Sequence, residues 1–450
     1  MHLPRKLQLL QIGLPVILAV VFFAVTRLIL PASATNLIPP IDFIDIAPTQ
    51  TGTVTITFVN GYGTYGTDCY DFIPNGLTGA AASYNGNSYY MGNPEGQTAT
   101  ALRLLAGSGN YNIVVDGTGC EDYPDNILSI FTEGVNLTSS SSPLLLENGA
   151  SMQLNADGTN TFGGDSAGIK VTAGNAITIT SSTNGTLNAI GGLGHTLGSI
   201  GAAGIGGDGT QGQSAFGDIT INGDVQVNAS GMGSGIGASN DYNLVNGGII
   251  TITDDARVSA VSTYVGAGIG PGECAYGDDN GQLMISGNAY VYAKGNNASE
   301  VDSTVYAGDG IGAVYCDTFS QVSITGGTVI AVGGDYDVPD TSTNGGNGIS
   351  ADNINISGGF VFALGTGDSQ ALNSGSGFDI NAPDIAITGG SVFGSNATIS
   401  SNPVDSHNHL VYPLYIPTTL SPNNANTANS NVDFSTATPS VPYTLHTLTP

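Results

Sequence analysis

The chain has 450 residues, of which 40% are hydrophobic and only 9% are charged, with 67 glycines and no tryptophan. It is long enough to bury a sizeable core, but its composition is unlike that of a globular α/β enzyme, which carries more Lys, Glu and Leu. The formal net charge of −28 at pH 7 excludes nucleic acid and anionic lipid as electrostatic partners and leaves divalent cations as candidates.

Residues 1–34 have the features of an export leader. Basic residues precede an apolar run from Leu7 to Val25, and Ala32-Ser33-Ala34 forms a small-residue cleavage site. The alternative is an uncleaved membrane anchor over residues 7–30, because about 20 apolar residues can span a bilayer. Either way, we expect the rest of the chain to be secreted or to lie at the cell surface. Without the leader, four basic residues face 35 acidic ones, a net charge of −31 (4 − 35).

Residues 35–100 have a less regular pattern than residues 101–399, with Val54–Val59 as their clearest strand. We expect them to form a β-rich N-terminal cap, since an open end of stacked strands leaves backbone groups unpaired. Residues 400–450 are rich in Pro, Asn and Thr. This composition indicates a tail or the start of a further module.

One phrase recurs between residues 163 and 395. A Gly-rich turn enters a hydrophobic residue, an alternating strand and a second turn come next, and the unit ends in Val-x-Ala. The turn half recurs as Ala167-Gly168-Ile169, Ala203-Gly204-Ile205, Ser234-Gly235-Ile236, Ala267-Gly268-Ile269, Asp309-Gly310-Ile311, Asn347-Gly348-Ile349 and Ser376-Gly377-Phe378. The steps between the hydrophobic residues are 36, 31, 33, 42, 38 and 29. A nearly constant unit with insertions is typical of stacked repeats.

The repeats have the pattern of strands. Apolar residues alternate at period two, as in Ile250 and Ile252, and glycine is too frequent for helix interiors. Each copy supplies about three short strands, and stacking the copies about 4.8 Å apart gives one continuous apolar core. We therefore predict an all-β fold, a right-handed parallel β-helix solenoid over residues 101–399.

The repeat phrases also carry a resemblance to a known family. Ser142-Pro143-Leu144, Gly149-Ala150-Ser151 and the later Ala-Gly-Ile-Gly and Ile-Thr-Gly-Gly phrases resemble bacterial cell-surface repeat proteins of the pectin-lyase-like parallel β-helix type, over about residues 135–395. Such proteins are often labelled carbohydrate-binding domains or adhesins. The matching residues belong to turns and core, so they indicate the fold and not the ligand.

Four cysteines in an exported chain indicate disulfides. Cys274 and Cys316 each follow a repeat isoleucine, Ile269 or Ile311, by five residues. Equivalent positions on adjacent coils lie within the Cα separation that a disulfide requires. We predict a Cys274–Cys316 bond and a Cys69–Cys120 bond between cap and first coils. Free or metal-bound thiols are the alternative.

Tyrosines on neighbouring repeats are the candidate ligand-binding residues. Tyr290 and Tyr292 lie two residues apart and so share one side of a strand. If Val291 faces the core, they belong to an outer ladder on which sugar rings could stack, and the alternative is a ladder that only covers the sheet. The full candidate set is Tyr264, Tyr290, Tyr292 and Tyr306.

Catalysis would require a different arrangement. A polysaccharide lyase needs a cation and a base, and a glycoside hydrolase needs a pair of carboxylates. Asp254, Asp255 and Arg257 are the only adjacent acids and base on one repeat. Neighbouring strand residues point to opposite sides, so we expect at most one of these aspartates to face outward with Arg257. The Asn-Thr-Asp, Gly-His-Gly and Arg-Ile-Lys phrases of pectin-degrading hydrolases are absent from the sequence.

Clusters of acidic residues offer oxygen ligands for Ca²⁺, the one cofactor considered. The candidates are Asp278, Asp279, Asp335 and Asp337. Their alternative role is as solvated loop acids.

These observations support three candidate functions. The first is a non-enzymatic, exported cell-surface protein for adhesion or for binding of glycan or extracellular matrix. The second is an extracellular polysaccharide lyase or glycoside hydrolase of the same fold, and the third is a purely structural surface stalk.

Overall fold

The computed structural model is all-β in the residues that it describes. With side chains, these are residues 103–117, 128–192, 201–209, 215–239, 247–272, 281–297, 307–314, 319–334, 345–365 and 385–392, and further strands are defined by their backbone. The chain divides into two units, residues 1–42 and 43–450, and the solenoid belongs to the second. The described residues contain no helix, and so none that could cross a membrane.

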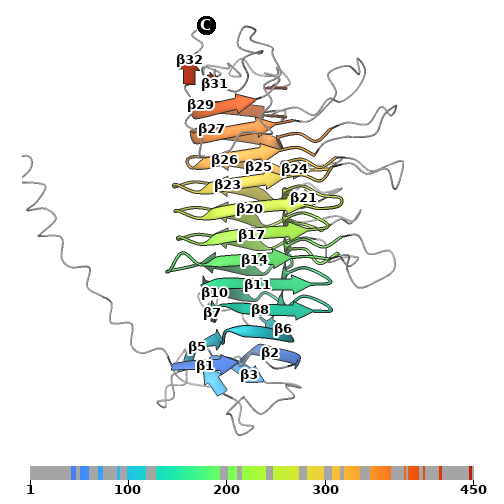
Figure 1. Cartoon of the computed structure of the whole chain (residues 1–450), viewed down its shortest axis with the longest axis vertical. Helices are drawn as coiled ribbons and strands as arrows, with labels where there is room; N and C mark the ends of the chain where they lie inside the picture. Colours follow the sequence, from blue (N-terminus) through green and yellow to red (C-terminus); the bar gives the residue numbers. More distant parts are fainter. Residues whose placement is uncertain are drawn as a thin grey trace, which may run out of the picture. The chain divides into compact units, whose positions relative to one another are not determined.

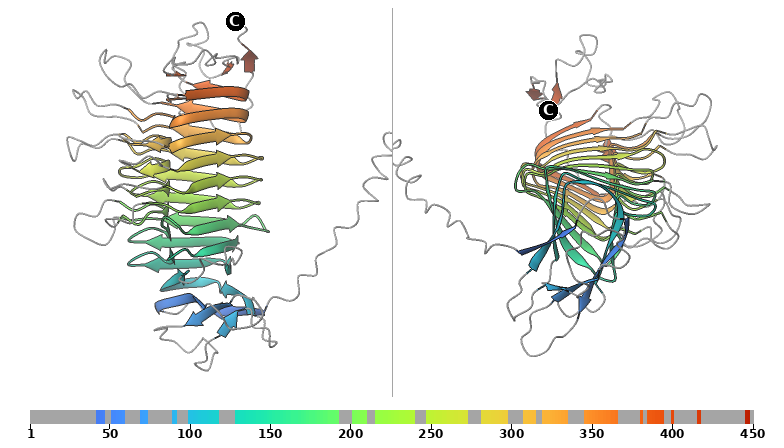
Figure 2. Two further views of the ribbon diagram at one scale, coloured as in Figure 1. Left: turned by 180° about the vertical axis from the view of Figure 1, so that it is seen from behind. Right: turned by 60° about the horizontal axis from the view of Figure 1, so that its bottom comes forward.

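The predicted parallel β-helix is confirmed. Each coil contributes three short strands, and each strand pairs in parallel with the equivalent strand of the next coil (Figure 1). The three sets of paired strands form three faces along the stack, and Figure 2 shows the stacked coils from behind and partly end-on. We call these the first, second and third face, in the order in which they follow the repeated Gly-Ile phrase.

The first face carries the Gly-Ile phrases. Its strands are β9 (Leu144–Glu147), β12 (Ile169–Val171), β15 (Ile205–Gly206), β18 (Ile236–Gly237), β21 (Ile269–Gly272), β24 (Ile311–Ala313), β28 (Ile380–Asn381) and β30 (Ile399–Ser400).

The second face comes next along the chain. Its strands are β5 (Ala99–Leu104), β7 (Leu128–Glu133), β10 (Ser151–Asp157), β13 (Ala176–Thr180), β16 (Asp218–Ile221), β19 (Ile249–Ile252), β22 (Gln282–Ile285) and β25 (Phe319–Ile324).

The third face completes each coil. Its strands are β8 (Val135–Ser139), β11 (Thr159–Gly164), β14 (Thr186–Ile190), β17 (Gln226–Gly231), β20 (Arg257–Ser262), β23 (Tyr290–Lys294) and β26 (Thr328–Val332). Three longer strands pass through more than one face, namely β6 (Gly107–Asp116), β27 (Ile349–Leu364) and β29 (Asp384–Gly394).

The pairing changes at both ends of the described strands. β2 (Thr51–Val59) pairs in parallel with β6, but β3 (Cys69–Ile73) and β4 (Tyr89–Met91) extend the sheet in antiparallel order. β1 (Asp42–Ile46) pairs with β5. After the last coil, β31 (Tyr415–Pro417) and β32 (Leu445–Thr447) form a separate antiparallel pair.

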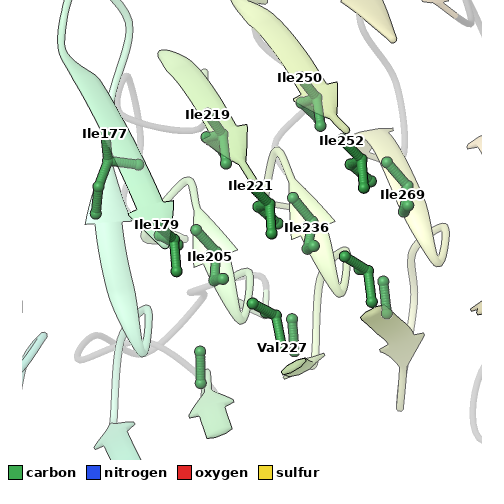
Figure 3. Close-up of a cluster of buried hydrophobic side chains, with 14 of the residues drawn as sticks. Ile177, Ile179, Ile205, Ile219, Ile221, Val227, Ile236, Ile250, Ile252 and Ile269 are labelled. Carbon is green, nitrogen blue, oxygen red and sulfur yellow. The ribbon is translucent and has the colours of Figure 1, made fainter. Parts of the chain in front are cut away.

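One file of hydrophobic residues runs the length of the first face. Successive coils align Ile113, Leu144, Ile169, Ile205, Ile236, Ile269, Ile311, Ile349, Ile380 and Ile399. Figure 3 shows Ile205, Ile236 and Ile269 of this file beside two further rows from the second face. The residues of this file from Ile113 to Ile349 are at most 1% exposed. Burying each such side chain contributes about 1.5–3 kcal/mol, so this part of the file forms a continuous core.

The last repeat differs from the prediction. The Gly377-Phe378 phrase predicts Phe378 as the next residue of the file, but Ile349 pairs with Ile380, a step of 31 residues (380 − 349). Phe378 itself lies outside the described residues. Backbone pairing sets the register, and it puts Ile380 next to Ile349 in the file.

Glycine follows isoleucine in the file for a steric reason. A Cβ atom on Gly237 would lie 2.0 Å from the carbonyl oxygen of Gly270 in the next coil, and one on Gly206 would lie 1.9 Å from that of Gly237. Their φ angles of 127° and 131° also disfavour any side chain. The coils therefore stack closely at this corner only because the side chain is missing.

Replacement of Gly237 by alanine tests this contact. We expect the Gly237→Ala variant to lose more than about 3 kcal/mol of unfolding free energy, because the backbones of two coils must separate. Gly174→Ala is the matched control, since Gly174 has a φ of 82° but nothing within 4 Å of an added Cβ. It should lose only the conformational contribution of about 1–2 kcal/mol. Equal losses in urea denaturation would contradict this account.

Candidate functional site

Tyr290 and Tyr292 lie on the outer side of the third face. Val291 between them is fully buried, at 0% exposure, whereas both tyrosines are half-buried. The condition for an outer ladder is therefore met. Burial raises the pKa of both phenols. Electrostatic repulsion from Tyr292 raises the pKa of Tyr290 further. Both hydroxyls stay protonated near neutral pH, so each can donate a hydrogen bond.

The outer ladder extends into aromatic residues that sequence reasoning missed. Tyr292 is in register with Ile330 and then Phe362, and Tyr290 is in register with Thr328 and then Phe360. The signal was present in the sequence, because Phe360-Val361-Phe362 repeats the alternation of Tyr290-Val291-Tyr292. The ladder in the C-terminal coils is thus aromatic and aliphatic, with Phe360 partly exposed and Phe362 buried at 8% exposure.

The same ladder is polar in the preceding coils. Below Tyr292 it continues through Ser259, Asn228 and Asn188. The Asn228 side-chain nitrogen donates to the Asn188 side-chain oxygen at 2.9 Å, and the Asn188 nitrogen donates to the carbonyl oxygen of Asn160 at 3.2 Å. The outer side of the third face therefore joins a polar half to an aromatic half.

The other two tyrosines of the predicted set do not join this ladder among the described residues. Tyr264 lies beyond the end of β20 and is 36% exposed. Tyr306 lies outside the described residues. The structure therefore places Tyr290 and Tyr292 in the ladder and Tyr264 outside it, while the role of Tyr306 stays a prediction.

Asp254 and Asp255 occupy a turn between the second and third faces. Both side chains are exposed, as is that of Arg257. The expectation that at most one aspartate would face outward was wrong, because it assumed a strand, whereas Asp254 has a φ of 59°. The Asp254 carboxylate accepts a hydrogen bond from the Gly223 nitrogen at 3.1 Å, and the Asp255 carboxylate accepts one from the Asn288 side chain at 3.1 Å. Both acids thus join adjacent coils.

The predicted cation ligands fall outside the described residues, and these are Asp278, Asp279, Asp335 and Asp337. Within the part of the chain that the structure describes, no group of three or more His, Cys, Asp or Glu residues is arranged to hold a metal ion.

The cysteine pairs remain predictions. Only the backbone of Cys69, in β3, is described, and Cys120, Cys274 and Cys316 lie outside the described residues. The Cys274–Cys316 prediction assumed that the two coils keep the same register from Ile269 and Ile311 to the cysteines, and they do not. Ile269 pairs with Ile311, but Gly272 then pairs with Ala313, so the register shifts by one residue before the cysteines.

Asp309 is a buried carboxylate that the sequence did not single out. It is 4% exposed, and it accepts hydrogen bonds from the backbone nitrogens of Asn347 at 2.6 Å and Ala313 at 3.3 Å and from the Ser350 hydroxyl. Burial raises its pKa to about 7, although these hydrogen bonds offset part of the increase. Since Asn347 and Ser350 belong to the next coil, Asp309 joins two coils inside the fold.

Lys170 and Asp208 form a buried ion pair. The Lys170 nitrogen lies 2.7 Å from a carboxylate oxygen of Asp208, and the two side chains are 9% and 8% exposed. Lys170 is in register with Gly206, so the pair joins the β12 and β15 coils. Removing one partner would leave the other charge buried and unpaired, which makes this pair structural in character.

The class of protein is therefore defined by its fold, a parallel β-helix solenoid with a mixed polar and aromatic outer ladder. No family model, curated protein or solved structure matches the chain.

Asp309 predicts a pH dependence of stability. Its pKa is raised from 3.8 to about 7 in the folded state, so the folded chain holds the proton more tightly than the unfolded chain. The stabilisation is complete below about pH 4 and is lost as the pH rises through about 7, by at most an amount on the order of 4 kcal/mol. The urea midpoint of the wild type should fall from about pH 5 to about pH 8, and that of Asp309→Asn should fall less.

The control is Asp255→Asn, since Asp255 is exposed in the turn before β20. This variant should keep the pH dependence of the wild type. If Asp309→Asn kept it as well, the buried carboxyl group would not be its source.

Proposed function

We propose that this chain is an exported, non-enzymatic cell-surface protein that binds carbohydrate through the outer side of its third face. The observation that carries the proposal is the ladder formed by the half-buried rings of Tyr290 and Tyr292 with the partly exposed ring of Phe360, two coils further on. These rings are carried on paired strands and not on loops, so little conformational entropy is lost when a ligand binds.

The chemistry of the face suits a sugar. Aromatic rings pack against the apolar faces of pyranoses, and the polar half of the ladder supplies the amides and hydroxyls of Asn188, Asn228 and Ser259 for hydrogen bonds. Both tyrosine hydroxyls remain available as donors. A binding protein needs no more than this, whereas a hydrolase needs a positioned carboxylate pair.

The proposal keeps the features that the sequence suggested. It includes export directed by residues 1–34, with cleavage or anchoring over residues 7–30, and an N-terminal cap within residues 35–100. It also includes the pectin-lyase-like type of β-helix that the repeat phrases resemble, and a C-terminal tail or module over residues 400–450. The resemblance supports surface adhesion as the biological role.

Substitution of the tyrosines tests the binding face. We expect Tyr292→Ala to weaken binding of the purified exported protein to its best ligand on a glycan array by about tenfold or more, which corresponds to ~1.4 kcal/mol. Tyr290→Ala should act in the same direction, because the two rings lie on one side of β23.

The matched control is Met284→Ala. Met284 is 40% exposed and points outward from β22, on the second face, so its removal should leave glycan binding unchanged. Failure of the wild-type protein to bind any glycan would reject the proposed function, and equal losses in the Tyr292 and Met284 variants would reject the proposed location.

A further inference from the structure

The outer side of the third face has an unusual charge composition. Its outward positions from β14 to the end of β27 hold Thr186, Asn188, Ile190, Gln226, Asn228, Ser230, Arg257, Ser259, Val261, Tyr290, Tyr292, Lys294, Thr328, Ile330, Val332, Phe360, Phe362 and Leu364. Phe362 is the one of these residues that is buried, at 8% exposure. The whole chain has 35 acidic and 7 basic residues. No acid occupies these outward positions, yet two of the four basic residues that follow the leader do.

The two basic residues border the tyrosine pair. Arg257 is in register with Tyr290 on the adjacent coil, about 4.8 Å away along the backbone stack. Lys294 lies on β23 itself, two residues beyond Tyr292 and on the same outer side. Neither forms an ion pair with any residue that the structure describes, whereas Lys170 is held by Asp208.

Asp254 and Asp255 are exposed acids in the turn before β20, at one edge of this face. Lys294 is in register with Val261, four residues along the strand from Arg257 and so about 13 Å from the turn end of the face. Charges separated by more than about 8 Å are largely screened at physiological ionic strength. The outward strand positions from β14 to β27 therefore carry two positive charges and no negative one, on a chain whose net charge is −28.

We infer that the carbohydrate bound by the third face is anionic. The inference rests on the proposed function and adds the chemical class of its ligand. In this arrangement the rings of Tyr290 and Tyr292 pack against sugar rings, while Lys294 at one end and Arg257 beside the rings pair with carboxylate or sulfate groups of the glycan. Arg257 can bind either group through two parallel hydrogen bonds.

A nucleic acid fits the face less well than an anionic glycan. Proteins that bind nucleic acid commonly neutralise about 6–10 phosphates. The face offers only two cations, and acids flank one of them. Two cations suit a glycan whose charges are widely spaced between uncharged ring faces.

Matched oligosaccharides measure the charge preference directly. The probes are a neutral cello-oligosaccharide, its C6-oxidised uronate counterpart and its sulfated counterpart, titrated by calorimetry against the purified exported protein. We expect at least one acidic probe to bind about tenfold tighter than the neutral one, and its affinity to fall with added salt. The comparison of uronate with sulfate identifies the charged group.

Variants locate the effect on this face. In the Arg257→Gln/Lys294→Gln double variant, the preference for the acidic probe over the neutral one should disappear, and the salt dependence of acidic-probe binding should weaken. Lys294→Arg is the control, because it keeps the positive charge and should keep the preference.

The outcomes separate this inference from the proposed function. Equal affinity of the wild type for neutral and acidic probes would overturn the anionic ligand but leave carbohydrate binding intact. Absence of binding to every probe and to every glycan on an array would overturn both. Tighter binding of a single-stranded oligothymidylate than of either acidic probe would also overturn the inference. A preference that survives in the double variant would do the same.

Discussion

Parallel backbone pairing between equivalent strands of adjacent coils is the constraint on which the structure depends. It places Ile205, Ile236 and Ile269 in one buried file and brings Gly206, Gly237 and Gly270 so close that no side chain fits between them. The hydrophobic core and the close approach of the glycines therefore have the same cause. The register of the strands fixes which side chains meet in the interior and which backbones meet at the turn. The recurring Gly-Ile-Gly phrase marks that register in the sequence.

Buried polar groups also join adjacent coils, and they do so without disturbing the register of the strands. Asp309 accepts hydrogen bonds from Asn347 and Ser350 of the following coil, and Lys170 pairs with Asp208 of the following coil. In each case the partner belongs to a neighbouring coil and satisfies the buried charge. The interior is thus held by hydrophobic files along its length and by a few polar contacts between particular coils.

How much the sequence could predict depended on how local the signal was. The alternation around Val291 was sufficient to place Tyr290 and Tyr292 outside, and the Gly-Ile spacing predicted the file as far as Ile349. It predicted Phe378 in place of Ile380, because a similar phrase does not specify pairing. Asp309 could not be foreseen, since its position holds Ala or Ser in the four earlier phrases and its burial follows only from the stacked coils.

Inward and outward residues of the third-face strands differ in how much they vary from coil to coil, and this difference has an evolutionary consequence. Inward residues such as Val258, Val291 and Val329 barely change from coil to coil, while their outward neighbours change from Ser259 to Tyr292 to Ile330. Duplicating a single coil would therefore lengthen the outer surface, and exchanging one would change its side chains. In both cases the inward residues that pack in the core would stay the same. Such a scaffold can acquire new specificities by recombination of units, without first passing through a destabilised intermediate.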